Sequence, residues 1–199
     1  VRAGHIQEVN FHGDAFDQGR QNLRVFEQLQ ELKQLLGPKF VMEFGNHDVW
    51  MIQAMVLGDA NALVDWVLTR GDVFFEEVGF RGIRAELKPL VQREDLPALQ
   101  RWAERILGDA RVEPLREVAN WMLANQRFFF IDERGWMHVH AGIPLDADGR
   151  PQMTLPQLQQ AQARLEGLQA TLPANGRLDR QPRQALRQLK GLLGDRDPQ

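Results

Sequence analysis

The strongest constraint on the fold is a strand–loop–helix order that occurs twice near the start of the chain. Gln7–His12 is typical of a short buried strand, and Gln21–Leu36 repeats apolar residues at helical spacing. Lys39–Phe44 is a second short apolar stretch, followed by a polar loop and a helix that we expect to begin near Val49. This order predicts parallel strands, with both loops at the carboxyl ends of the strands, where open α/β sheets place their functional sites.

The rest of the chain changes from helical to strand-like and back. Apolar residues recur at helical spacing from residue 59 to 126, and we expect a helical insertion or cap because strand character returns after it. Arg127–Ile131 and Trp136–His140, separated by a turn, predict a β-hairpin that joins the two parallel strands. Pro144–Pro156 is expected to be a loop before a further helix, and Arg183–Leu193 is an amphipathic segment.

Composition places the chain among ordinary globular domains. It has 199 residues, a net charge of −3, 43% hydrophobic and 26% charged residues, and we expect one domain over residues 1–199. The slightly acidic balance argues against binding of a nucleic-acid duplex, and no apolar run reaches membrane-spanning length, so we expect a soluble, cytoplasmic protein. The absence of cysteine excludes disulfides, thiolate metal ligands and cysteine nucleophiles.

Three polar clusters interrupt the predicted strands. They are Gly13–Gly19, Gly45–Asp48 and His138–Gly142. Carboxylate and amide oxygens together with imidazole nitrogens suit Mn, Fe or Zn bound with open coordination positions. The glycines among them allow tight turns and close approach of the backbone to an anion. The residues themselves therefore predict a metal-assisted site.

The same clusters resemble the motifs of a known enzyme family. Gly13–Gly19 has the pattern GDxxDxG, Gly45–Asp48 reads GNHD, and Val139–Ile143 is similar to a VHGGL-type block. In this order they resemble the calcineurin-like metallophosphoesterase family, in particular its phosphoprotein-phosphatase branch. That resemblance implies an α/β sandwich of β-sheets flanked by helices. It covers Val9 to about Pro144, whereas Pro156–Gln199 matches no pattern.

The resemblance also implies a role for each matching residue. Asp14 corresponds to the carboxylate that bridges two metal ions, Asn46 to a ligand of the second ion that also touches phosphate, and His140 to another ligand of that ion. His47 corresponds to the proton donor to the leaving oxygen, and Asp17 to the carboxylate that orients it. The implied reaction is hydrolysis of a phosphoric ester by a water activated between two divalent ions, Mn first and Fe or Zn as alternatives. The implied substrate is a phosphoprotein or a nucleotide-type ester.

The chain also departs from the family pattern. No D-x-H block precedes Asp14, where His5 does not replace it, and no GH block follows His140. We therefore expect a fragment that lacks both terminal blocks, that binds metal weakly or at one position, and that hydrolyses esters slowly. Gln18 stands where many relatives have arginine, which leaves Arg20 as the candidate for binding phosphate.

Other interpretations of the same residues stay open. The chain could be a catalytically incomplete binding module of the same fold, or a one-metal hydrolase that uses His138 and His140, two residues apart on one strand face. The Asp and Asn residues could be turn and helix-cap residues. His5 and His12 are expected to be packing or surface residues. We expect the tryptophans to be core residues: Trp50, Trp66, Trp102, Trp121 and Trp136.

Overall fold

The computed structural model describes residues 8–17, 19–140, 148 and 150–172, and these mix helices with strands as the α/β prediction requires. The elements are β1 (Val9–His12), α1 (Asn22–Leu36), η2 (Gly37–Lys39), β2 (Phe40–Glu43), α2 (Asn46–Leu57), α3 (Ala60–Trp66), η3 (Val67–Gly71), α4 (Asp72–Glu77), α5 (Ile83–Gln92), α6 (Leu96–Gly108), η4 (Ala110–Val112), α7 (Glu113–Asn125), β3 (Gln126–Arg127), β4 (Phe130–Ile131), β5 (Met137–His138) and α8 (Leu155–Gln169). The predicted segment Arg183–Leu193, His5, Gln18 and residues 144–147 and 149 of the predicted Pro144–Pro156 loop lie outside the described residues.

The main sheet is parallel, as predicted from the strand–loop–helix order. β1 pairs with β2 over four residues, from Val9 opposite Phe40 to His12 opposite Glu43, and β2 pairs with β3. Because β1 and β2 are parallel and in register, the loops that follow them leave the same edge of the sheet. The polar clusters Gly13–Gly19 and Gly45–Asp48, which follow these strands, therefore lie next to each other.

The predicted hairpin exists, but it does not join this sheet. β4 and β5 pair antiparallel in a separate two-stranded sheet, and only β3, just before them, extends the parallel one. The Arg127 carbonyl accepts the Phe44 N–H at 2.9 Å, whereas the Phe128 N–H points away from β2 and donates to Gln162 Oε1 of α8 at 2.9 Å. Pairing with β2 ends at Arg127, so the hairpin lies outside the parallel sheet, which corrects the predicted arrangement.

The two helices that follow β1 and β2 are both capped by carboxylates. The backbone N–H groups of Asn22 and Leu23 at the start of α1 donate to Glu77 of α4 at 2.8 and 3.1 Å. α2 begins at Asn46, three residues before the predicted position, where the Asp48 carboxylate accepts the Gly45 N–H and the Asp14 carboxylate accepts the His47 N–H. The GNHD motif is therefore the beginning of a helix rather than a loop that precedes one.

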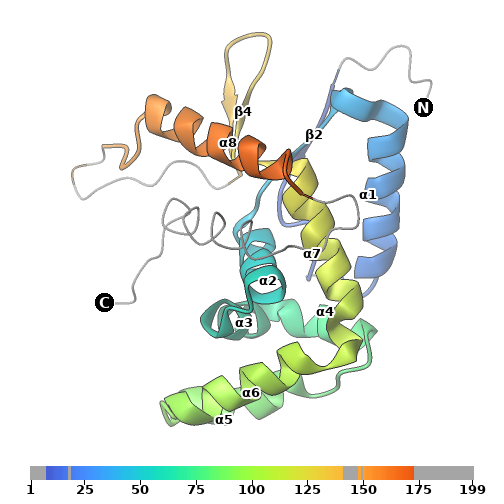
Figure 1. Cartoon of the computed structure of the whole chain (residues 1–199), viewed down its shortest axis with the longest axis vertical. Helices are drawn as coiled ribbons and strands as arrows, with labels where there is room; N and C mark the ends of the chain where they lie inside the picture. The colour runs from blue at the N-terminus through green and yellow to red at the C-terminus, as the bar shows by residue number, and fades with distance from the viewer. Residues whose placement is uncertain (1–7, 18, 141–147, 149, 173–199) are drawn as a thin grey trace.

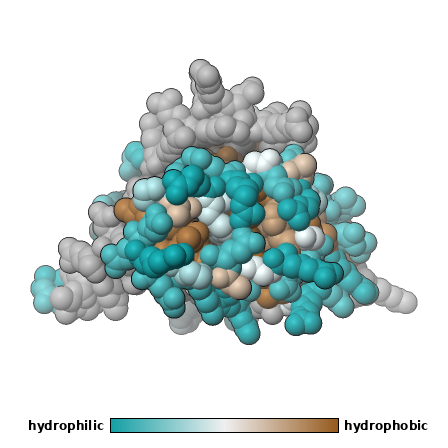
Figure 2. Space-filling view, turned by 90° about the horizontal axis from the view of Figure 1, so that it is seen from below, coloured by the Kyte–Doolittle hydropathy of each residue, from teal (hydrophilic) through white to brown (hydrophobic). Residues whose placement is uncertain are grey.

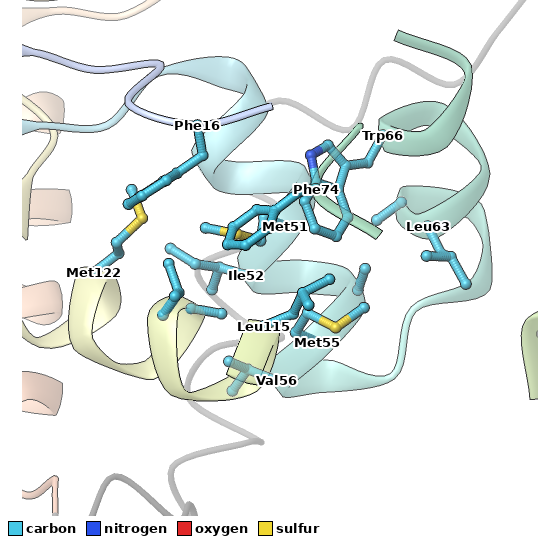
Figure 3. Close-up of a cluster of buried hydrophobic side chains, with 14 of the residues drawn as sticks. Phe16, Met51, Ile52, Met55, Val56, Leu63, Trp66, Phe74, Leu115 and Met122 are labelled. Carbon is cyan, nitrogen blue, oxygen red and sulfur yellow. The ribbon is translucent and has the colours of Figure 1, made fainter. Parts of the chain in front are cut away.

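The stretch from residue 59 to 126 is helical as predicted, and it forms α3 to α7 before β3. α2 packs against both α3 and α7, and the three helices bury a cluster of methionine, leucine and aromatic side chains (Figure 3). α5 and α6 lie at the opposite end of the molecule from α8 and the hairpin (Figure 1). Figure 2 shows mostly hydrophilic side chains with apolar ones between them on the face seen from below. Within the described ranges, no helix is long and apolar enough to cross a bilayer.

Candidate active site

The loops after β1 and β2 pack directly against each other through two glycines. A Cβ on Gly13, which has φ +63°, would lie 2.4 Å from the Gly45 nitrogen. A Cβ on Gly45 would lie 2.0 Å from Asp14 Oδ1. Side chains at either position would separate the loops, so the contact between them requires glycine. Asp14 itself has a left-handed backbone, with φ 50°, a conformation that costs about 1–3 kcal/mol for a residue with a side chain.

Asp48 connects the same two loops through hydrogen bonds to their backbone. Its Oδ2 accepts hydrogen bonds from the backbone N–H groups of Asp14 and Gly45 and from Gln126 Nε2, each at 3.0 Å. Burial raises the pKa of Asp48 to about 6, and the hydrogen bonds from Gly45 and Gln126 oppose this rise. The ionised carboxylate thus fixes Asp14 relative to the start of α2 and to β3.

The structure brings together the two residues that the sequence predicted as a proton-transfer pair. His47 Nδ1 lies 2.6 Å from Asp17 Oδ2, and the same oxygen accepts a hydrogen bond from Trp66 Nε1 at 2.9 Å. Asp17 is fully buried and has φ 75°, and its backbone N–H donates to Asn22 Oδ1 at 2.7 Å. Burial raises the pKa of Asp17, while His47 and Trp66 oppose the rise by favouring the carboxylate.

Asp14 contacts both a second histidine and the backbone of the first. Its Oδ1 accepts the His47 backbone N–H at 3.1 Å, and its Oδ2 lies 3.1 Å from His140 Nε2. His140 Nδ1 is 2.5 Å from the His12 carbonyl oxygen, so this nitrogen carries a hydrogen and donates it. In a neutral ring, Nε2 is then an acceptor that faces the acceptor oxygen of Asp14. His140 Nε2 and Asp14 Oδ2 attract each other only when a proton or a metal cation lies between them.

This contact tests whether the predicted metal ligands suit a cation. Asp14 and His140 offer a carboxylate oxygen and an imidazole nitrogen toward one point, and the second ring nitrogen of His140 donates to a carbonyl, as is usual for a histidine ligand. Asn46 is the first residue of α2, next to His47, and its side chain is exposed. This donor set fits one hard or borderline divalent ion. In the described part of the chain, no group of three or more His, Asp and Glu side chains is arranged to hold a metal.

The two histidines of the alternative one-metal site have separate partners. His138 Nε2 lies 3.2 Å from Asp132 Oδ2, whereas His140 contacts Asp14. The His138 ring also stacks on Phe130 at 4.3 Å between ring centroids. These contacts give His138 a place in the hairpin and do not support a metal site shared by the two histidines.

Two further predicted residues have weaker support. Arg20, the candidate for binding phosphate, is exposed and has no ion pair among the described residues. His12, expected to be a packing or surface residue, is half exposed, with its Nδ1 3.0 Å from Glu43 Oε2. Glu43 is fully buried, so the imidazole of His12 supplies the hydrogen bond that a buried carboxylate needs.

Trp66 and Gln126 were not predicted as site residues. Trp66 was expected to be a core residue, and it is fully buried, but its indole N–H belongs to the site. Its apolar neighbours give the same sequence signal as any core tryptophan. Gln126 ends the helical stretch with no distinguishing pattern. Trp136, also predicted as core, is 70% exposed at the turn of the hairpin, which corrects that prediction.

Comparisons with known proteins add no family to this description. No family model matches the chain, and no curated protein and no solved structure resembles it significantly.

Proposed function

We propose that the protein is a metal-dependent hydrolase of phosphoric esters, a phosphatase of the calcineurin-like metallophosphoesterase type. The observation that carries the proposal is the pairing of His47 with a buried Asp17 next to the contact between Asp14 and His140. The three sequence blocks supply these residues in the family's order. The family's sandwich of two β-sheets, and its placement of the helical stretch from residue 59 to 126 as a cap, belong to the same proposal.

In this proposal, His47 is the general acid. Asp17 binds Nδ1 and leaves Nε2 as the nitrogen that gives its proton to the leaving oxygen as the bond to phosphorus breaks. The backbone of His47 is bound to Asp14 Oδ1, so the acid and the proposed ligand have a fixed separation. A proton donor placed in this way is typically worth about 10²–10⁴-fold in rate.

Asp14, His140 and Asn46 are the residues that would hold a divalent ion, with Mn²⁺ as the first candidate. When bound, such an ion supplies Lewis acidity toward phosphoryl oxygens and a water ligand of lowered pKa. Of these side chains only Asp14 and His140 are in contact with each other, so we expect a bound ion to exchange with solvent. Hydrolysis by this chain should therefore be slow. The substrate is a phosphate monoester or diester of the phosphoprotein or nucleotide type.

The test is release of phosphate from an alkyl phosphate, whose leaving oxygen needs a proton, by the 199-residue chain with Mn²⁺, compared with the same assay in EDTA. We expect metal-dependent turnover that His47→Ala lowers about 10²–10⁴-fold. Asp14→Asn should remove the dependence on metal. The matched control is His138→Ala, since this histidine contacts Asp132 outside the proposed centre. An effect of His138→Ala as large as that of His140→Ala would instead support a one-metal site built on the two histidines.

A non-catalytic binding module is the second candidate. It is favoured by the absence, over the described ranges, of a group of three His, Asp or Glu ligands. For this function we expect calorimetry to show Mn²⁺ binding that depends on Asp14 and His140, without phosphate release from any ester of the assay panel. The same two measurements therefore separate the two functions.

A further inference from the structure

We propose that Trp66, at the end of α3 in the helical stretch, is a positioning residue for the Asp17–His47 pair. Its indole N–H donates to Asp17 Oδ2 at 2.9 Å, the same oxygen that lies 2.6 Å from His47 Nδ1. The contact itself is a property of the fold, whereas its consequence for catalysis rests on the proposed function.

The carboxylate of Asp17 needs this second donor because it has few others. Asp17 is fully buried, and its Oδ1 has no hydrogen-bond partner in the described part of the chain. Burial without donors disfavours the ionised form, and each donor to the carboxylate stabilises it. With both His47 and Trp66 on Oδ2, the carboxyl group keeps one orientation. Without the indole, the group could rotate and offer its unpaired oxygen to His47.

The indole can hold the Asp17 carboxylate in one orientation because its own ring is closely packed. Trp66 is fully buried, and the ring is in contact with Phe75 at 5.2 Å and with Phe74 at 6.4 Å between centroids (Figure 3). Gly71 lies under the ring, where a Cβ would be 2.8 Å from three of the indole atoms. Close packing on these sides fixes the direction of the N–H.

The position also links two parts of the chain that are distant in sequence. Asp17 follows β1, and Trp66 lies 49 residues later, beyond α2. The helical stretch therefore contributes a donor to the proposed acid pair, in addition to covering α2. A core role alone would need the ring but not its nitrogen.

Trp102 provides a matched control within the same stretch. It is buried in α6, and its Nε1 has no hydrogen-bond partner among the described residues. Trp66→Phe and Trp102→Phe thus remove equal volumes from the buried parts of the helices. Only the first removes a donor to Asp17.

The first measurement is the ¹⁵N–¹H spectrum of the indole groups in the full chain, with Trp66→Phe and Trp102→Phe used for assignment. We expect the Trp66 resonance to lie downfield of the Trp102 resonance, because its proton is bonded to a carboxylate, and to move in Asp17→Asn. A Trp66 resonance that is unaffected by Asp17→Asn would overturn the contact. Because this measurement needs no turnover, it stays decisive if the proposed hydrolase activity is not found.

The second measurement is the Mn²⁺-dependent hydrolysis of an alkyl phosphate, on which the proposed acid matters most. Trp66→Phe should lower kcat about 10-fold, which corresponds to about 1.4 kcal/mol, and should leave KM unchanged because the indole does not touch substrate. Trp102→Phe should stay within about twofold of the native kcat. Equal losses in both variants, or a change in KM alone, would assign Trp66 a purely structural role. Gly71→Ala keeps the indole N–H, but its Cβ would lie 2.8 Å from Nε1 and push the ring away from Asp17, so it should also lower kcat.

Discussion

Asp48 is predicted to make the protein less stable as pH rises from acid to neutral. Burial raises its pKa from the ordinary 3.8 to about 6 in the folded chain. Between these two values the folded form binds a proton that the unfolded form does not bind. The contribution of this group to stability is therefore fully present at low pH and is lost as the pH rises through about 6. One pKa unit corresponds to about 1.4 kcal/mol, so the total loss is about 3 kcal/mol.

The assay is urea unfolding of the native chain and of Asp48→Asn at about pH 4.5 and pH 7, in EDTA. The asparagine oxygen can accept the hydrogen bonds from Asp14, Gly45 and Gln126, while its amide group cannot ionise. From the lower to the higher pH, we expect Asp48→Asn to gain about 2 kcal/mol of unfolding free energy relative to the native chain, since about 1 kcal/mol of the total is already lost at about pH 4.5.

Asp109→Asn is the control for this experiment. Asp109 is exposed, and the hydrogen bonds from Arg111 lower its pKa to about 2, so the group is ionised throughout the range. The difference between Asp109→Asn and the native chain should not change with pH. If the difference in unfolding free energy between Asp48→Asn and the native chain is also the same at both pH values, then the two loops are not joined by a buried carboxylate that ionises in this range.

Two further predictions concern the loops and the cation. Gly45→Ala should lower the unfolding free energy by about 3 kcal/mol or more, because a Cβ there would lie 2.0 Å from Asp14 Oδ1. The control is Gly167→Ala in α8, where a Cβ would meet nothing within 4 Å, so this variant should be neutral or stabilising. Urea unfolding measures both variants. Binding of Mn²⁺ should weaken as pH falls, because a proton and a cation compete for the space between His140 Nε2 and Asp14 Oδ2; calorimetry that finds the same affinity at low and neutral pH would contradict this.

The sequence allowed the parallel strands and the meeting of the loops to be predicted for a simple reason. Strand, loop and helix follow one another twice over short distances, and parallel pairing in register then places both loops at one edge. The contact of Asp17 with His47 follows from this arrangement. The beginning of α2 at Asn46 was missed, although an acidic residue at its third position, Asp48, is a known signal for a helix start.

The contacts made by distant residues could not be predicted in the same way. Trp66 is 49 residues from Asp17, beyond α1, β2 and α2, and nothing in a helical apolar pattern shows where an indole N–H will point. The hairpin was predicted as part of the main sheet because its residues favour strands. In the structure, pairing with β2 ends at Arg127 and the Phe128 N–H donates to Gln162 of α8, and no local sequence pattern signals either feature.

The most direct test of the account is how the effect of His47→Ala depends on the leaving group. His47 is proposed to give a proton to the leaving oxygen, and an alkyl phosphate needs that proton far more than a nitrophenyl phosphate does. With Mn²⁺ present, we predict that His47→Ala lowers kcat for the alkyl ester by about 10²–10⁴-fold and for the nitrophenyl ester much less. An equal loss on both esters would show that His47 does not act as the acid, and would contradict the central claim.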